Sequence, residues 1–290
     1  MLNVAIIGMG TVSSLHIEAY LGFPRRCRIT HLVDSFSEKI EQKKKAYKLS
    51  AGVYSDYKQI LDDPAIDLVS ICTPPYVHAE MAVAFLKAGK NVIVEKPMAA
   101  SLEECDAVIK AVKKSGRVFS PVAQNRFTDP FMKLKKTLDT GKAGKVVHAQ
   151  VDSLWWRGHC YYDLWWRGLW EKEGGGCTLN HAVHHIDLLG WMLGRPDKVS
   201  AMLSNTSHDN AEVEDISAAV MLYGGGGLCA KGALAQVTGS VIHHGEEQQL
   251  VFQGEKARIS APWKELTGTI TVGGSCDKRT GTSGRKGRGS

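Results

Sequence analysis

A lysine stands between a carboxylate and a proline in the segment Glu95-Lys96-Pro97. The apolar run Asn91-Val92-Ile93-Val94 precedes it, so this lysine is expected at the carboxyl end of a buried strand. Burial and neighbouring cations would lower its pKa from about 10.4, which would let it hydrogen-bond a reacting oxygen or relay a proton. The alternative is a lysine that extends its ammonium group to solvent from a buried stem.

A second candidate is His184, with Asn180 four residues before it. The run Gly174-Gly175-Gly176 opens a predicted helix and would let the backbone approach a ligand closely. Residues four apart project from one face of an α-helix. Because histidine titrates near neutrality, His184 suits a base that takes a hydroxyl proton while hydride leaves the carbon. Asparagine cannot act as a base, so Asn180 would orient the substrate. A buried structural histidine is the alternative.

The same segment also allows a metal interpretation. It contains Cys177, His181, His184 and His185, and the pair His181 and His185 has the HxxxH spacing that can bind zinc on a helix. The usual third ligand and the catalytic glutamate of such sites are not evident in the pattern. We therefore expect no metal here.

A glycine-rich turn follows the first apolar run. Val4 to Ile7 is typical of a strand buried on both faces, and the hexad Gly8-Met9-Gly10-Thr11-Val12-Ser13 comes directly after it. The first glycine permits a sharp strand-to-helix turn, and the second lets a diphosphate lie against bare backbone. Asp34 lies 21 residues past Ser13, where a carboxylate would hold a ribose 2′-hydroxyl. A βαβ unit without a ligand is the alternative.

This spacing predicts a dinucleotide site. Because the carboxylate would repel a 2′-phosphate, NAD is favoured over NADP. The residues expected to hold it from this turn are Gly8, Gly10, Thr11, Val12 and Asp34.

Strand and helix signals alternate from the turn to about residue 123. Such alternation predicts an α/β fold with a doubly wound parallel sheet, in which ligands bind at the carboxyl ends of the strands. The polar residues at those ends are therefore further candidates. Those expected to contact the cofactor are Thr73, Pro74, His78, Glu95, Lys96 and Gln124, and Arg126 is expected to contact substrate.

The second half of the chain has a different character. A helix at 131–138 is followed by strand-like segments at 145–153, 198–203, 216–223, 227–234, 248–252 and 267–272. Runs of strands after a βαβ half predict an α+β domain with an open, largely antiparallel sheet. The expected domains are a dinucleotide-binding domain at 1–122, a substrate and oligomerisation domain at 123–272, and a disordered Gly/Ser/Lys/Arg tail at 273–290.

A tetrapeptide recurs after ten residues. Trp155-Trp156-Arg157-Gly158 returns as Trp165-Trp166-Arg167-Gly168, with Tyr161 and Tyr162 between the copies. Aromatic planes and guanidinium groups suit a sugar ring and a carboxylate or phosphate, so Tyr162 and Arg167 are expected at the substrate. For any one tryptophan, a core position or a subunit contact is an equal alternative.

Composition excludes several classes of protein. The formal charge of +6 falls to about +2 without the tail, whose five basic residues face one aspartate, so no nucleic-acid partner is expected. No apolar run approaches the roughly 20 residues of a membrane helix. The seven cysteines are scattered, with no CxxC pair, and the chain starts directly in a predicted strand. We therefore expect reduced thiols and a cytoplasmic protein.

Five stretches stand in order along the chain: IIGMGTVSSLHIEAY, CTPPYVHAE, GKNVIVEKPMA, QNRF and GGGCTLNHAVHHIDLLGWMLG. Together they make the chain, from Met1 to about Trp263, resemble the family of glucose-fructose oxidoreductase, inositol dehydrogenase and the MocA proteins. The resemblance implies a Rossmann domain, an open-faced α/β domain, and NAD(P)-dependent oxidation or reduction at a carbon of a sugar or polyol. It places the family's catalytic lysine at Lys96, its catalytic histidine at His184 and its frequent aspartate at Asn180.

Within that family the segments around Asn180, Tyr162 and Arg167 are most similar to sugar-nucleotide 3-dehydrogenases acting on UDP-N-acetylglucosaminuronate. Leu169 departs from this subgroup, which often has threonine there. The resemblance also implies a homo-oligomer, a dimer or a tetramer.

The chain departs from the family pattern after Gly254-Glu255-Lys256, where relatives continue into further sheet and a returning helix. Two functions are therefore open. One is a sugar or nucleotide-sugar dehydrogenase, and the other is a non-catalytic or inactive dinucleotide-binding homologue with a truncated C-terminus.

Overall fold

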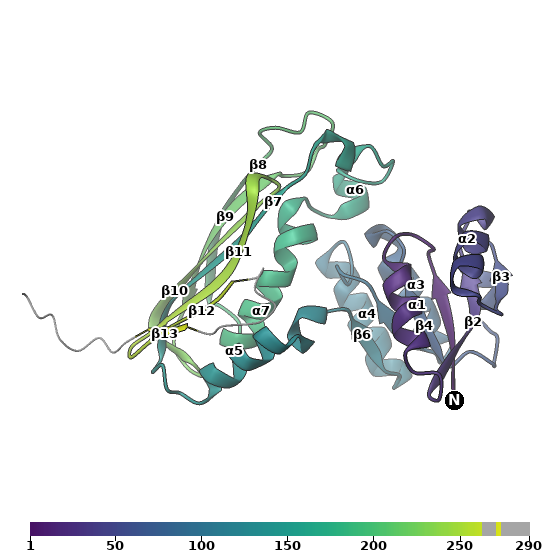
Figure 1. Cartoon of the computed structure of the whole chain (residues 1–290), viewed down its shortest axis with the longest axis horizontal. Helices are drawn as coiled ribbons and strands as arrows, with labels where there is room; N and C mark the ends of the chain where they lie inside the picture. The colour runs from purple at the N-terminus through teal and green to yellow at the C-terminus, as the bar shows by residue number, and fades with distance from the viewer. Residues whose placement is uncertain (263–270, 274–290) are drawn as a thin grey trace, which may run out of the picture.

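The computed structural model describes residues 1–262 and 271–273 and contains two sheets joined by short helices (Figure 1). The first sheet is formed by residues 2–121 and the second by residues 146–273. The predicted fold class, a parallel doubly wound sheet followed by a largely antiparallel one, is confirmed. The predicted boundary at 122/123 falls between β6 and η3 (Gln124–Phe127), and independent folding of each part stays a prediction.

The first sheet has six parallel strands in the order β3-β2-β1-β4-β5-β6. The strand order reverses between β1 and β4, and such a switch point leaves a crevice at the carboxyl ends of the strands. The strands are β1 (Leu2–Ile7), β2 (Cys27–Val33), β3 (Gly52–Tyr54), β4 (Leu68–Ile71), β5 (Asn91–Val94) and β6 (Phe119–Pro121).

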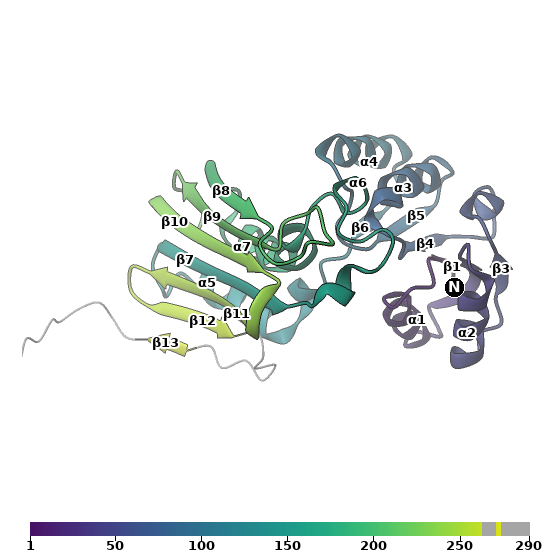
Figure 2. The same ribbon diagram turned by 90° about the horizontal axis from the view of Figure 1, so that it is seen from above.

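Helices cover both faces of this sheet (Figure 2). On one face α1 (Ser13–Leu21) and α2 (Ser37–Tyr47) bury Ile17 and Ile40 against β1 and β2. On the other face, α3 (His78–Lys87) and α4 (Leu102–Ser115) bury residues that include Phe85 and Val108. Apolar strands such as Val4–Ile7 are consequently buried on both sides, as their unbroken hydrophobic runs predict.

The second sheet has seven strands in the order β13-β12-β11-β7-β10-β9-β8. Only the central pair, β7 and β10, is parallel. Its strands are β7 (Val146–Trp156), β8 (Lys198–Ser204), β9 (Ile216–Tyr223), β10 (Cys229–Ser240), β11 (Ile242–Gly254), β12 (Arg258–Pro262) and β13 (Thr271–Gly273).

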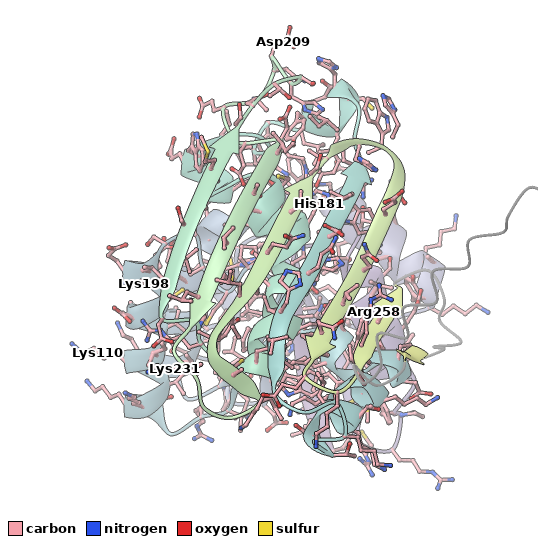
Figure 3. All side chains as sticks on the ribbon, turned by 90° about the vertical axis from the view of Figure 1, so that its left-hand side faces the viewer. Lys110, His181, Lys198, Asp209, Lys231 and Arg258 are labelled. Carbon is pink, nitrogen blue, oxygen red and sulfur yellow. The ribbon has the colours of Figure 1, made fainter. Side chains whose placement is uncertain are left out.

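Helices α5 (Asp129–Asp139) and α7 (Val183–Leu193) lie on the face of the second sheet that is turned toward the first (Figure 1). Leu134 and Leu188 are fully buried there against alternate residues of the central strands, including Ala149, Val151 and Leu250. The opposite face carries no helix of the described chain, and its side chains are open to view in Figure 3. The second domain is thus a sheet covered on one side only.

Some elements differ from those that the sequence predicts. The short strand β3 was not expected, because three residues carry too little periodic signal. Strand β10 begins two residues later and ends six residues beyond the expected 227–234. The expected strand at 267–272 lies outside the described residues except for its last two residues, which fall in β13. The expected disordered tail at 273–290 lies outside them except for Gly273, which ends β13. No helix among the described residues is long and apolar enough to cross a membrane.

Candidate active site

The glycine turn between β1 and α1 has the geometry that its residue types predict. Gly8 has φ +88°, and a Cβ there would lie 2.7 Å from the carbonyl oxygen of Cys72 at the end of β4. Gly10 is exposed, with no atom within 4 Å of a Cβ built on it. Ser13 donates its hydroxyl to the Gly10 carbonyl oxygen at 2.7 Å. Gly8 is therefore needed for packing and backbone conformation, whereas Gly10 faces open space.

Asp34 ties this turn to the end of β2. Its Oδ2 accepts a hydrogen bond from the Met9 N–H at 2.7 Å, and its Oδ1 accepts one from the Phe36 N–H at 2.9 Å. Each carboxylate oxygen keeps a lone pair for a further donor. The predicted contact of Asp34 with a ribose hydroxyl stays a prediction.

The turn fits a dinucleotide diphosphate. Among the described residues, no group accepts a hydrogen bond from the N–H of Thr11 or Val12, which precede the first helical residue. Unpaired N–H groups and the dipole at a helix N-terminus favour anionic phosphate. The bare backbone of Gly10 leaves room for it.

Glu95, at the end of β5, is held by a buried polar network that the sequence did not indicate. His16 Nε2 lies 3.0 Å from Glu95 Oε1, and His16 Nδ1 lies 2.8 Å from the Ser70 hydroxyl. Burial alone would raise the pKa of Glu95. The hydrogen bond from His16, the charge of His16 and the neighbouring Lys96 lower it by more, so the pKa of Glu95 lies below its usual value. An ionised Glu95 beside Lys96 stabilises the ammonium form of the lysine.

Lys96 reaches across to the second domain. Its Nζ donates a hydrogen bond of 3.0 Å to the carbonyl oxygen of Asn180. Burial has the largest effect on Lys96 and lowers its pKa. The carboxylate of Glu95 raises the pKa and the charge of Arg167 lowers it, so the pKa of Lys96 lies below the ordinary value for lysine. Lys96 therefore lies inside the molecule, as its position after β5 predicts, and not in solvent.

His184 lies near this lysine in the first turn of α7. Burial, followed by the charge of Lys96, lowers the pKa of His184 to about 4, against the opposing charges of Glu95 and Asp187. Its imidazole is consequently neutral at pH 7 and can accept a proton. The structure thus brings Lys96, Asn180 and His184 together from two domains.

The backbone before His184 differs from the α-helix expected there. Thr178–Ala182 forms a π-helix, and the α-helix begins only at Val183. Asn180 and His184 are therefore not joined by a regular α-helical turn, although they remain in one continuous helical segment. Single π turns inside helices occur frequently at functional sites.

The glycine run before this helix packs closely against protein backbone, and its predicted approach to a ligand stays a prediction. A Cβ on Gly174, which has φ +74°, would lie 2.6 Å from the Ala100 carbonyl oxygen of the first domain. A Cβ on Gly176 would lie 1.9 Å from the carbonyl oxygen of Glu214. The start of the helix can therefore pack against Ala100 of the first domain and against Glu214 only because glycine stands at both positions.

The residues expected after β6 have different surroundings. Gln124 is exposed, whereas Arg126 forms a bidentate ion pair with Asp187 through bonds of 2.8 Å and 2.5 Å. That pair anchors η3 to α7 one turn from His184. A substrate contact by Arg126 stays a prediction, because the guanidinium already has a carboxylate partner.

The residues after β4 form a small structural unit. His78 is 1% exposed, with Nδ1 2.7 Å from the Pro97 carbonyl oxygen and Nε2 2.7 Å from the Thr73 carbonyl oxygen. It therefore holds the loop after β4 against the loop after β5. Thr73 and Pro74 are half-buried at the surface of that unit. Direct cofactor contacts by these three residues stay predictions.

The aromatic segment supplies another part of the site. Arg167 lies over the rings of Tyr161 and Trp166, at 4.1 Å and 4.4 Å from their centroids. Its Nη1 donates to the Tyr161 hydroxyl and to Glu173 Oε1, the latter at 3.2 Å. Tyr162, by contrast, is 6% exposed and packs at Gly168, with its ring 4.7 Å from that of His208. The substrate contact expected of Tyr162 also stays a prediction.

Two protein-family models match the chain. One, described as an oxidoreductase family with an NAD-binding Rossmann fold, covers residues 2–122, and the other, the C-terminal domain of the same family, covers residues 131–260. The chain belongs to the Gfo/Idh/MocA oxidoreductase family. This result confirms the resemblance seen in the five sequence stretches.

Several relatives in the Gfo/Idh/MocA family are sugar or polyol dehydrogenases. Levoglucosan dehydrogenase of Pseudarthrobacter phenanthrenivorans is 30% identical over 210 residues, which are 70% of this chain and 54% of that protein. The NADP(+) scyllo-inositol 2-dehydrogenase IolW of Bacillus subtilis is 28% identical, with 97% of this chain and 81% of that protein covered. The chain thus spans only about half the length of the first of these relatives.

A solved structure in the family has the same arrangement of domains. The WlbA dehydrogenase from Bordetella pertussis, in complex with NADH and UDP-GlcNAcA, superposes with a TM-score of 0.86 at 26% identity. The match covers 96% of this chain and 78% of that one. The match therefore extends over both domains of this chain.

Sequence reasoning missed three residues of the Gfo/Idh/MocA site described here. They are His16, which holds Glu95, Asp187, which holds Arg126, and Glu173, which is 1% exposed and holds Arg167. A carboxylate directly before three glycines was a usable signal for Glu173. The other two partners lie 79 and 61 residues from the groups they bind, so no local pattern reveals them.

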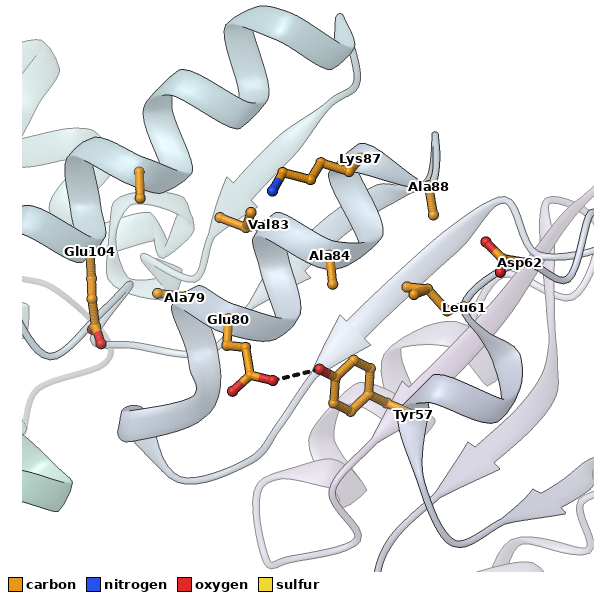
Figure 4. A pocket seen from close by; sticks show the side chains of 11 residues that line it. Tyr57, Leu61, Asp62, Ala79, Glu80, Val83, Ala84, Lys87, Ala88 and Glu104 are labelled. Atoms are coloured by element: carbon orange, nitrogen blue, oxygen red, sulfur yellow. Dashed lines mark hydrogen bonds between the residues drawn. The ribbon is translucent and has the colours of Figure 1, made fainter.

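A hollow in the first domain lies away from this site. A depression of about 790 Å³ runs along α3, between η1 (Tyr57–Ile60) and α4 (Figure 4). Its wall includes Tyr57, whose hydroxyl donates to Glu80 at 2.7 Å. None of the predicted cofactor residues lines it.

Proposed function

We propose that the chain is an NAD-dependent dehydrogenase that transfers a hydride between nicotinamide and a ring carbon of a sugar or sugar nucleotide. The observation that carries this proposal is the hydrogen bond from Lys96 to the Asn180 carbonyl oxygen. It places a lysine from the dinucleotide domain beside the helix that holds His184. The membership in an oxidoreductase family with an NAD-binding fold supports the same function.

The chain's own groups divide the proton chemistry between them. His184, neutral because its pKa is about 4, accepts the proton of the substrate hydroxyl. Lys96 donates a hydrogen bond from its Nζ to the same oxygen as it becomes a carbonyl oxygen. Bound NAD supplies the acceptor for the hydride that leaves the carbon. Asn180 orients the substrate and takes no proton.

The substrate class is supported by the names of the relatives. Levoglucosan and scyllo-inositol are a sugar derivative and a polyol, and the WlbA complex contains the nucleotide sugar UDP-GlcNAcA. No observation in the described residues favours the alternative of a non-catalytic homologue. An enzyme is favoured by the cluster of Lys96, Asn180 and His184 and by the match to the family's C-terminal domain.

A homo-oligomer is part of the proposal. The register of β8, β9 and β10 places the apolar side chains Met202, Val220 and Leu234, which are 82%, 49% and 45% exposed, on the uncovered face of the second sheet. A sheet face of this kind suits a second copy of the chain, in a dimer or a tetramer. The cytoplasmic location stays a prediction.

The test is a panel of UDP-sugars, free sugars and polyols with NAD, followed by absorbance of the reduced nicotinamide. We expect at least one member to be oxidised, with NADP used less well than NAD. If the protein binds NADH, seen as quenching of tryptophan fluorescence, but oxidises no member of the panel, the proposal is wrong.

A further inference from the structure

A chain of hydrogen bonds joins α1 to the end of β5. The Tyr20 hydroxyl lies 3.0 Å from the Ser70 hydroxyl, which lies 2.8 Å from Nδ1 of His16. Nε2 of His16 lies 3.0 Å from Oε1 of Glu95. The other carboxylate oxygen of Glu95 accepts the backbone N–H of Lys96 at 3.1 Å. The chain therefore ends beside the lysine proposed to act on the substrate oxygen.

The chemistry of these groups gives the hydrogen bonds one direction. An ionised Glu95 only accepts, so Nε2 of His16 donates to it whether the imidazole is neutral or protonated. In the neutral imidazole Nδ1 then accepts the Ser70 hydroxyl proton. Ser70 in turn accepts from Tyr20, whose hydroxyl keeps its proton because burial raises its pKa. The two hydroxyl groups thus select the tautomer of His16 that donates to Glu95.

The Glu95 carboxylate depends on this donor because little water reaches it. Ser70 is 0% exposed, and the side chains of His16 and Glu95 are each 11% exposed. A carboxylate at this depth is costly unless it is paired and hydrogen-bonded. Within the part of the chain that the structure describes, no side chain other than His16 donates to Glu95. Loss of the His16 donor would therefore favour the neutral acid.

Glu95 is the main group that favours the ammonium form of Lys96. Burial lowers the pKa of Lys96, and the carboxylate of Glu95 opposes this more strongly than that of Glu173, while the charge of Arg167 adds to the lowering. A group that keeps Glu95 ionised therefore also favours protonation of Lys96. The other titratable groups that interact with Lys96 or Glu95 are Cys72, His78, His181 and His184.

From this geometry we propose that His16, fixed by Ser70 and Tyr20, is a positioning residue that holds Glu95 as a carboxylate and thereby shifts Lys96 toward its ammonium form. The inference rests on the proposed dehydrogenase function, because it concerns the lysine that donates to the reacting oxygen. His16 belongs to α1, the helix that begins at the glycine turn. One helix therefore joins the proposed dinucleotide turn to the proposed proton chemistry.

The test measures the protonation of Lys96 in the full-length protein. Acetic anhydride reacts with the free amine only, so the acetylation of Lys96, followed by mass spectrometry, gives a rate at each pH. The midpoint of this profile reports protonation, and its plateau at high pH reports access. We expect His16→Asn to move the midpoint to lower pH and to raise the rate below the midpoint by about 3- to 10-fold. A changed plateau with the native midpoint would overturn the proposal.

A matched pair of amides separates the two nitrogens of His16. A glutamine amide nitrogen reaches the place of Nε2, whereas that of asparagine reaches only the place of Nδ1. His16→Gln should therefore keep most of the native midpoint, and equal midpoints in the two variants would contradict the assigned role. His159→Asn, with a side chain 61% exposed, is the control and should leave the midpoint unchanged.

A double variant shows whether His16 acts through Glu95. Glu95→Gln removes the charge outright and should lower the midpoint by the largest amount. The double variant His16→Asn/Glu95→Gln should have the same midpoint as Glu95→Gln alone, because groups that act in one chain are not additive. Additive shifts would mean that His16 acts on Lys96 by another route, against the proposal.

Melting temperatures show which variants are folded, and Ser70→Ala is the second variant if His16→Asn does not fold. It removes the donor that fixes the tautomer of His16, so the midpoint should fall by less than in Glu95→Gln. A midpoint that does not fall in Ser70→Ala would then overturn the proposal.

The two proposals can fail separately, because acetylation of Lys96 requires no sugar. If His16→Asn lowers the midpoint but the native protein oxidises no sugar, the dehydrogenase function fails and the role of His16 stands. If a sugar is oxidised and the midpoint is unchanged, the role of His16 fails and the function stands. Where a sugar is oxidised, the alkaline limb of kcat should also move to lower pH in His16→Asn.

Discussion

The ammonium group of Lys96 lies 3.0 Å from the carbonyl oxygen of Asn180, which is 84 residues further along the chain. This contact joins the end of β5 to the π-helix that precedes α7. Because Lys96 belongs to the dinucleotide domain and Asn180 to the other, the distance between the two domains sets the position of the proposed catalytic groups.

Removal of the Lys96 charge should abolish most turnover without loss of NADH binding. Lys96→Met keeps the apolar stem but removes the donor to the reacting oxygen, so kcat should fall by about 10²- to 10⁴-fold. The measurement is kcat from nicotinamide absorbance, with the dissociation constant of NADH from fluorescence. Lys87→Met, in the hollow along α3, is the matched control and should retain activity. Full activity in Lys96→Met would contradict the assigned role.

The buried histidines should make the protein sensitive to acid. The pKa of His184 falls from 6.5 to about 4 on folding, so the unfolded chain takes up a proton first as pH falls. The stability contributed by neutral His184 is therefore present above pH 6.5 and is lost as pH falls toward 4. His184→Gln should remove on the order of 2 kcal/mol of the pH dependence between pH 7 and 4.5. Urea unfolding at several pH values measures this, with the exposed His159→Gln as control.

Asp34 should control both the turn and the choice of cofactor. Asp34→Ala leaves the Met9 and Phe36 N–H groups without their acceptor and removes the carboxylate at the end of β2. We expect NADH affinity to fall by about tenfold or more, while NADPH affinity falls less because a repelling charge is gone. Titration with both nucleotides tests this, and Asp62→Ala, an exposed carboxylate elsewhere in the first domain, should change neither affinity. An equal loss for both nucleotides would count against discrimination by Asp34.

Two glycine substitutions should have opposite effects. Gly174→Ala places a Cβ 2.6 Å from Ala100 in a backbone conformation with φ +74°, so it should destabilise the protein by about 1–3 kcal/mol and loosen the contact between domains. Gly190→Ala, in the middle of α7 with no atom within 4 Å of the new Cβ, should stabilise it by about 0.5–1 kcal/mol. Denaturant unfolding measures both. A stable, fully active Gly174→Ala variant would mean that the domains can move apart without cost.

The sequence alone determined the parts of the molecule that depend on local pattern. Backbone sterics and periodicity over a few residues predict the uninterrupted apolar strands, the turn from Gly8 to Ser13 and its spacing to Asp34. Local pattern also marks Lys96 and His184 as candidate catalytic residues. Tertiary structure decided which of these side chains meet. His78 is enclosed by two backbone carbonyl groups, and Arg126 is bound to Asp187. The Pro97 and Asp187 partners lie 19 and 61 residues away and leave no periodic trace in the sequence. The repeat in the sequence shows that two arginines lie ten residues apart, but only the folded structure shows that both guanidinium groups lie over the ring of Tyr161.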